Sequence, residues 1–162
     1  MAVIALVLIC AILCFAVVLL VGAPYVPTLA PQVEAALKLA NLKSGQHLIE
    51  LGCGDGRVVL AAAKQGLKVT GYELNPVLAL VAWARTRRYR KQVKIIWGDF
   101  WGREWPEADA VFVFLLDRFM TKLDARLKEC PYKPIKLLSF AFKVPGKTVS
   151  KREAGIYLYR YR

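Results

Sequence analysis

Short apolar runs alternate with amphipathic segments along most of the chain, which is the pattern of strands and helices that follow one another. Runs of Val, Ile, Leu and aromatic residues predict five buried strands, over 47–51, 68–72, 93–97, 110–115 and 135–140. The segments before and between them carry apolar side chains at helical spacing and predict helices over 32–42, 58–65, 76–90 and 117–129. Two further segments predict a closing hairpin, 147–150 and 155–161.

The order of these elements predicts one α/β domain over residues 32–162. Alternating strands and helices favour a mostly parallel, doubly wound sheet, because each crossover helix returns the chain to the same edge. Five parallel strands and a terminal hairpin make seven strands in all. Gly66 is typical of a helix end, and Asn75 followed by Pro76 is typical of a helix start.

The first 22 residues contain no charged, amide or hydroxyl side chain and no proline. At ~1.5 Å per residue such a helix reaches roughly 33 Å, the thickness of a bilayer's hydrocarbon core. We therefore expect residues 1–22 to be a transmembrane anchor and the proline-containing residues 23–31 to be a stiff linker. A cleaved signal peptide is the alternative, but a positive n-region is missing and the apolar run is long for one.

Charge sets the expected orientation. All 24 Lys and Arg residues follow the apolar segment, so the positive-inside rule predicts a single-pass membrane protein with its domain in the cytosol. The net charge of +12 also calls for a surface or partner. We expect the densest basic run to face anionic lipid, with nucleic acid as the alternative. The side chains expected at the lipid are those of Arg85, Arg87, Arg88, Arg90 and Lys91.

Few residues are suited to metal or disulfide chemistry. The four cysteines are spread over the apolar segment, a glycine-rich turn and a helix end, so reduced thiols are expected. The single histidine, His47, leaves no plausible His/Cys metal site. We therefore expect no metal.

The run from Leu48 to Arg57 carries the most specific signal. A buried strand ends at the acid Glu50 and enters a turn with glycine at positions 52, 54 and 56, after which a helix begins. This brings bare backbone and a helix N-terminus against a ligand. The G-x-G-x-G spacing differs from the dinucleotide fingerprint G-x-G-x-x-G and resembles motif I of the class I S-adenosylmethionine-dependent methyltransferases.

Acids and aromatic residues follow the next strands at the same sheet edge, where ligands of α/β sheets bind. Glu50 or Asp55 is placed to accept a hydrogen bond from the ammonium of S-adenosylmethionine. Glu73 is placed to accept from its ribose hydroxyls, and Asp99 from the adenine amine, with Phe100 or Trp101 packing on the ring. The predicted cofactor site comprises Glu50, Gly52, Cys53, Gly54, Asp55, Gly56, Glu73, Leu74, Asn75, Asp99 and Phe100.

Two longer runs, 49–64 and Gly71–Pro76, resemble the single-span protein-lysine methyltransferase family, whose eukaryotic members modify the c subunit of ATP synthase and the adenine nucleotide translocase. The resemblance covers most of residues 32–162. It implies a Rossmann-like, seven-stranded methyltransferase sheet preceded by one transmembrane helix, and a membrane-anchored lysine N-methyltransferase acting on a membrane protein. The chain departs from the family after the fifth strand, where residues 139–145 replace a basic residue and a Phe-Pro-Phe-Pro run.

Methyl transfer to an amine needs alignment and a neutral amine, which a desolvating aromatic pocket favours. The predicted substrate pocket comprises Trp101, Phe140 and Phe142, with Asp117 as a polar contact, and no general base is assigned. Alternatives are a methyltransferase for a lipid, a quinone or another small molecule, an RNA methyltransferase, and a non-catalytic cofactor-binding module. The Asn/Asp-Pro-Pro-Tyr motif of base methylation is absent at residues 115–118, so no nucleic-acid partner is expected.

Overall fold

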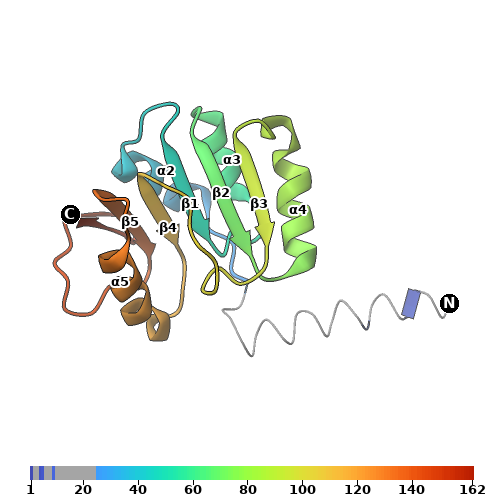
Figure 1. Ribbon diagram of the computed structural model, residues 1–162. Coiled ribbons are helices and arrows are strands. Elements are labelled where there is room, and N and C mark those ends of the chain that lie inside the picture. The colour runs from blue at the N-terminus through green and yellow to red at the C-terminus, as the bar shows by residue number, and fades with distance from the viewer. Residues whose placement is uncertain (2–3, 6–8, 10–24) are drawn as a thin grey trace.

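The computed structural model of the 162-residue chain describes residue 1, residues 4–5, residue 9 and residues 25–162. Its helices are α2 (Ala30–Ala40), α3 (Arg57–Lys64), α4 (Pro76–Thr86) and α5 (Met120–Glu129), with short 3-10 helices η1 (Arg87–Tyr89) and η2 (Asp117–Phe119). Its strands are β1 (His47–Leu51), β2 (Lys68–Glu73), β3 (Val93–Trp97), β4 (Ala110–Val113), β5 (Ile135–Phe140), β6 (Lys151–Glu153) and β7 (Ile156–Tyr161) (Figure 1).

The strands form one sheet in the order β3-β2-β1-β4-β5-β7-β6. Strands β1 to β5 pair in parallel, whereas β7 pairs antiparallel with both β5 and β6. The strand order reverses direction at β1, so the crossovers from β1 to β3 and from β4 to β5 run to opposite sides. The predicted seven-stranded α/β sheet is therefore confirmed.

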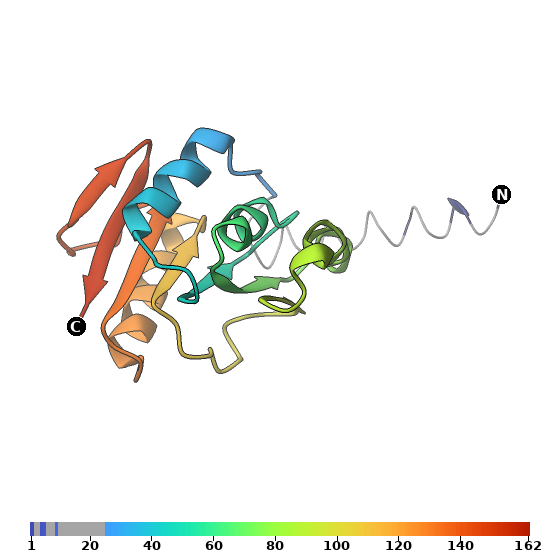
Figure 2. The same cartoon turned by 90° about the horizontal axis from the view of Figure 1, so that it is seen from above.

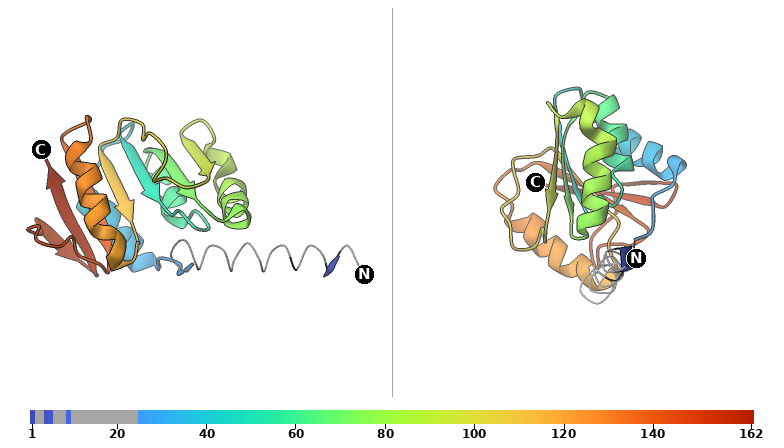
Figure 3. Two further views of the ribbon diagram at one scale, coloured as in Figure 1. Left: turned by 60° about the horizontal axis from the view of Figure 1, so that its bottom comes forward. Right: turned by 90° about the vertical axis from the view of Figure 1, so that its right-hand side faces the viewer.

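Successive residues of the strands point to opposite faces of the sheet, and each face has its own core. Leu48 and Phe112 pack on one face with α2 and α3, and Ile49 and Val111 pack on the other with α5. Figures 2 and 3 show α2 and α3 on one side of the sheet and α5 on the other. The loop between β3 and β4, residues 98–109, covers part of the α5 side through Trp105.

Several predicted elements have different bounds, and two of the differences have a clear local cause. The first strand of the hairpin is β6, not 147–150, because the turn lies at Ala154 and Gly155, whose φ values are 47° and 79°. Glu153 consequently pairs with Ile156 across that turn. The helix predicted over 76–90 is α-helical only to Thr86, whose hydroxyl donates to the carbonyl of Ala82, and continues as η1.

The predicted single-pass membrane localisation is wrong by the structure. Within residues 1, 4–5, 9 and 25–162, no helix combines the length and the apolar character that a bilayer span requires. The helices α2 and α4 have 11 residues each, whereas a span needs about 20. Most of the predicted anchor, 2–3, 6–8 and 10–22, lies outside the described residues, as do linker residues 23–24. Helix α2 begins at Ala30 and so includes the last two linker residues.

Candidate active site

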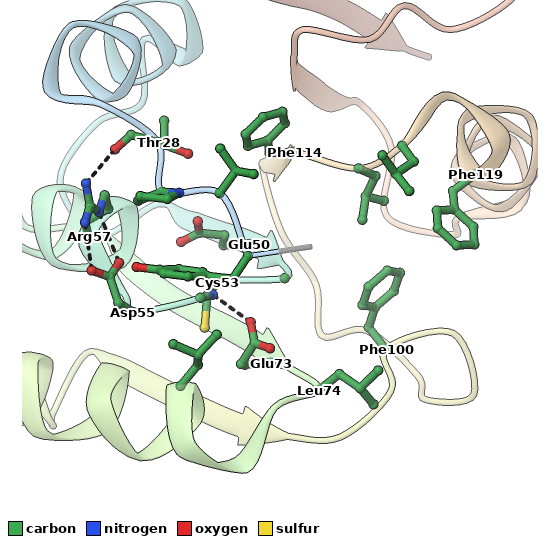
Figure 4. A pocket seen from close by; sticks show the side chains of 18 of the residues that line it. Thr28, Glu50, Cys53, Asp55, Arg57, Glu73, Leu74, Phe100, Phe114 and Phe119 are labelled. Carbon is green, nitrogen blue, oxygen red and sulfur yellow. Dashed lines mark hydrogen bonds and ion pairs between the residues drawn. The ribbon is translucent and has the colours of Figure 1, made fainter. Parts of the chain in front are cut away.

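A cavity of about 340 Å³ opens at the edge of the sheet where the parallel strands end. Its walls come from the loop after β1, the end of β2, the loop after β3, the segment after β4, and Phe142 beyond β5. Residues 25–28, which precede α2, close one side (Figure 4). One end of the cavity is rich in carboxylates and bare backbone, and the other is aromatic.

The glycine loop after β1 turns its backbone toward this cavity. Gly52 and Cys53 donate their backbone N–H groups to the carbonyl of Tyr72, which fixes the loop to β2. Gly52 has a φ of +82°, and a Cβ placed there meets no atom within 4 Å, so a ligand has room beside its backbone. A Cβ on Gly54 comes within 2.9 Å of the Tyr25 ring, so this glycine allows residue 25 to pack closely.

Glu73 ties the glycine loop to the start of α4. Its side chain is buried, Oε2 accepts from the Gly54 N–H at 2.7 Å, and Oε1 accepts from the Asn75 N–H at 2.8 Å. Burial raises the pKa of Glu73, and these backbone hydrogen bonds oppose the rise. The side chain of Asn75 accepts from the Val77 and Leu78 N–H groups, which confirms the predicted N-cap.

Glu50 is the most unusual group in the cavity wall. The residue is 4% exposed, and its Oε2 atom has no hydrogen-bond partner. Burial raises the pKa of the carboxyl well above its ordinary value, the nearby Glu73 and Asp55 carboxylates add to the rise, and a hydrogen bond from the Val59 backbone opposes it. A buried unpaired oxygen is costly, so this site is suited to a ligand that donates to it.

Asp55 is already paired within the protein. Arg57 donates to both of its oxygens, and Arg85 donates to Oδ2 at 2.6 Å. Burial alone raises the pKa of Asp55, but the two guanidinium groups outweigh it and lower the pKa to about 2. Arg57 also donates to the carbonyl of Thr28, which holds the segment 25–28 over the cavity. Arg85, predicted to face lipid, therefore makes an intramolecular ion pair.

The aromatic end joins two chain segments. The rings of Phe100 and Trp101 have centroids 4.7 Å apart, and Trp101 lies 6.1 Å from Phe119 of η2. Phe114 lines the cavity, and Phe140 packs behind it at 4.4 Å.

A tight turn after β5 brings Phe142 into the wall. At this turn Ala141 has a φ of 66°, and the Phe142 N–H donates to the Phe140 carbonyl. This is the geometry of a γ-turn, which is rare and strained for a residue with a side chain.

The structure brings most of the predicted site residues together. The cavity wall includes Glu50, Gly52, Cys53, Gly54, Asp55, Glu73, Leu74, Asp99, Phe100, Trp101 and Phe142. Four others lie outside it. Gly56 forms the N-cap of α3 against Ala82, Asn75 caps α4, Phe140 supports Phe114, and Asp117 is exposed on η2.

Sequence reasoning missed ten further wall residues: Tyr25, Val26, Pro27, Thr28, Arg57, Leu78, Phe114, Leu115, Leu116 and Phe119. The position of residues 114–116 directly after a parallel strand was a usable signal. Residues 25–28 carried no such signal, because their place in the wall depends on contacts with the distant Arg57 and Gly54. The predicted lipid contact of Arg87, Arg88, Arg90 and Lys91 stays a prediction. No cluster of His, Cys, Asp and Glu in the described part of the chain could hold a metal ion.

Comparison with known proteins adds independent information. Residues 50–151 match the family model described as the ANTKMT methyltransferase domain. The human lysine N-methyltransferase of the ATP synthase c subunit is 33% identical over 129 residues, which are 77% of this chain and 54% of that protein. A protein-lysine N-methyltransferase of Saccharolobus islandicus is 31% identical over 148 residues, 84% of this chain and 92% of the relative. The chain thus spans about half the length of the vertebrate relatives that it matches.

Solved structures show the same fold. An RNA methyltransferase from Salinibacter ruber, in complex with S-adenosyl-L-homocysteine, superposes with a TM-score of 0.76 at 29% identity. The superposed region covers 84% of this chain and 92% of the Salinibacter ruber chain. A SAM-dependent methyltransferase from Thiobacillus denitrificans, with the same ligand, has a TM-score of 0.60 at 22% identity over 75% of this chain and 53% of its own. The second likeness concerns the fold alone.

Proposed function

The chain belongs to the ANTKMT methyltransferase domain family, and we propose that it uses S-adenosylmethionine to methylate the side-chain amine of a lysine in a protein acceptor. One observation carries the proposal. A single cavity has a carboxylate end around Glu50 and Glu73 and an aromatic end around Phe119 and Phe142. The first end suits a cationic nucleoside, and the second suits an alkyl chain that ends in an amine.

The residues at the polar end fit the cofactor. The unpaired Oε2 of Glu50 lacks a donor that the ammonium group would provide, and the open backbone at Gly52 leaves room for the methionine portion. Glu73 would accept from the ribose hydroxyls, and Asp99 from the adenine amine. When bound, S-adenosylmethionine supplies a sulfonium-linked methyl group that is transferred in one displacement to a neutral amine.

The protonation of Glu50 would shift toward the carboxylate when the cofactor binds. Burial favours the neutral carboxyl, whereas a cation at Oε2 favours the carboxylate. A cationic ligand therefore lowers the pKa of Glu50 and favours its carboxylate form. The residue would act as a selective partner for a positive charge, because a neutral ligand offers the buried carboxylate no compensating charge.

The aromatic residues would prepare the acceptor. Apolar walls exclude water, and desolvation lowers the pKa of a lysine amine, so more of it carries the free lone pair that forms the new N–C bond. Phe114, Phe119 and Phe142 would align the alkyl chain of the lysine. No general base is required, because the proton leaves the amine before the transfer.

An RNA acceptor is the second candidate. The net charge of +12 and the likeness to the Salinibacter ruber protein, described as an RNA methyltransferase, favour it. Lysine is the better fit, because the segment after β4 is the apolar Phe114-Leu115-Leu116 and because the curated relatives are protein-lysine N-methyltransferases. Several of those relatives are named for the c subunit of ATP synthase or for the adenine nucleotide translocase, so we include a membrane protein as the acceptor in the proposal.

The test uses the full chain, labelled S-adenosylmethionine, and membrane and soluble extracts of the source organism. We expect label that survives ribonuclease, is lost with protease, and maps by mass spectrometry to methyl-lysine in a membrane protein. Glu73→Gln should abolish the labelling, whereas the exposed Glu107→Gln should retain it. Label lost with ribonuclease establishes the RNA candidate, and label in the lipid extract establishes a lipid or quinone acceptor. Binding of S-adenosylhomocysteine without any transfer identifies a non-catalytic module.

A further inference from the structure

The loop 98–109 contains no helix or strand, yet two of its side chains contact α5 at a matching spacing of four residues. Trp101 and Trp105 are four residues apart on the loop, and Lys122 and Arg126 are four residues apart on the helix. Lys122 Nζ lies 4.3 Å from the Trp101 ring centroid, and the Arg126 guanidinium lies 4.1 Å from the Trp105 ring centroid. Because residues i and i+4 share a helix face, the two cations stack on the two rings side by side.

Hydrogen bonds reinforce this arrangement, which we name the Trp–cation clamp (Trp101, Trp105, Lys122 and Arg126). The Arg126 guanidinium donates to the backbone carbonyls of Trp101 and Arg103. The indole N–H of Trp105, which is 9% exposed, donates to the carbonyl of Phe100 at 3.1 Å. Arg126 thus holds the loop by two carbonyls and by the ring of Trp105.

The clamp joins the two sides of the cavity. The loop carries Asp99 and Phe100 to the cofactor side and Trp101 to the aromatic end, and α5 directly follows η2, whose Phe119 lines that end. The rings of Trp101 and Phe119 meet across this junction at 6.1 Å. Lys122, Trp105 and Arg126 are not among the wall residues, so any effect they have on ligands is exerted through the loop.

We propose that Arg126 is a positioning residue, which holds the loop 98–109 against α5 so that the cofactor wall and the acceptor wall form one pocket. This rests on the proposed function for the identity of the two ligands. Without the guanidinium, Asp99 and Phe100 lose their fixed place at the cofactor, and Trp101 loses its fixed place beside Phe119. Cofactor binding then has to order the loop, which weakens the binding of both ligands.

The test compares Arg126→Met, Arg126→Lys and Lys122→Met in the full chain, with Lys128→Met as the matched control. Lys128 is a cation on the same helix, but it pairs with Asp124 instead of the loop. We expect Arg126→Met to raise the dissociation constant of S-adenosylhomocysteine in calorimetry, and the KM of the acceptor, about tenfold each. Arg126→Lys should recover part of this loss, since it keeps a cation over Trp105.

Hydrogen exchange supplies a readout that a general loss of stability does not give. Amides of residues 98–109 should exchange faster in Arg126→Met, while those of α2 and α3 stay at the wild-type rate. The proposal is overturned if Arg126→Met binds S-adenosylhomocysteine like the wild type, or if Lys128→Met weakens binding as much. If Arg126→Met does not fold, Lys122→Met decides by the same criteria. A wild-type protein that binds S-adenosylhomocysteine but transfers no methyl group contradicts the proposed function and leaves the loop attachment intact.

Discussion

Glu50 holds a buried oxygen without a partner, so the charge of this residue governs both stability and binding. Its folded pKa lies well above the ordinary value of 4.5. As pH rises past that value, the unfolded chain ionises before the folded one, and the folded state loses stability until pH passes the folded pKa. Glu50→Gln should therefore lose less stability between pH 4 and pH 7 than the wild type, and bind S-adenosylhomocysteine more weakly.

Denaturant unfolding at both pH values and calorimetry with S-adenosylhomocysteine measure these effects. Parallel pH profiles for wild type and Glu50→Gln, together with equal affinities, would contradict the role of Glu50. The substitution Glu50→Gln has opposite effects on stability and on binding. In the empty protein the unpaired oxygen is a cost, whereas in the loaded protein the same oxygen contacts the ligand.

Asp55 gives the opposite pH dependence. The guanidinium groups of Arg57 and Arg85 hold its pKa near 2, compared with an ordinary 3.8, which corresponds to about 2 kcal/mol of stability. Because the folded pKa is depressed, this stability is present above pH 4 and is lost as pH falls toward 2. In acid titrations of the free energy of unfolding, wild type should fall more steeply than Asp55→Asn over that window. A wild-type curve as flat as that of the variant counts against the ion pairs.

At the scale of elements, the turn after β5 stores strain. A side chain at φ 66° in a γ-turn costs the folded state on the order of 1–3 kcal/mol. Glycine avoids this strain but destabilises the folded state by about 0.4–1 kcal/mol, because it gives the unfolded chain more conformational entropy. Ala141→Gly should therefore raise the free energy of unfolding by about 1 kcal/mol, and Ala141→Val should lower it. Chemical denaturation measures both, and a destabilised glycine variant would show that Ala141 is unstrained.

Elements whose signals are local were predictable from the sequence. The Asn75-Pro76 cap, the glycine loop and the strand pattern each depend on a few neighbouring residues, and the structure has all three. The hairpin strand was misplaced, because Ala154 does not reveal its positive φ in the sequence. The attachment of the loop 98–109 was also hidden. Trp101 and Lys122 become neighbours only after β4 has joined the sheet.

At the scale of the molecule, Tyr161 links the sheet to α5. Its hydroxyl donates to the buried carboxylate of Asp124 at 2.7 Å, and burial together with that carboxylate raises the pKa of Tyr161. Tyr161→Phe leaves Asp124 with Lys128 as its remaining partner and should cost about 1–3 kcal/mol of unfolding free energy. Thermal and denaturant unfolding measure this cost. Lys128→Met, on the exposed side of the same carboxylate, should cost less, and a larger cost there would reverse the assignment.

The whole-chain predictions had mixed outcomes. The prediction that the chain belongs to the protein-lysine methyltransferase family is confirmed by the family match and the curated relatives, whereas its methyl-transfer activity is part of our proposal. That prediction rested on the motifs at the ends of β1 and β2, which the fold requires to converge. The membrane localisation rested on the apolar run of residues 1–22, on the distribution of Lys and Arg and on the family resemblance, and it is wrong by the structure. The cavity wall at residues 25–28 could not be foreseen, because proline content indicates a linker and not its contacts.

The position of β7 has a consequence for the protein while it is being made. β7 pairs with β5 at six positions and lies between β5 and β6, although it follows both in the chain. A growing polypeptide therefore exposes the bare edge of β5, and β6 has no strand to join, until residues 156–161 have emerged from the ribosome. Earlier strands can assemble in the order of translation, but the sheet closes only in one late insertion. During synthesis, the open flank of β5 is an unpaired strand edge, the kind of surface on which another chain can pair.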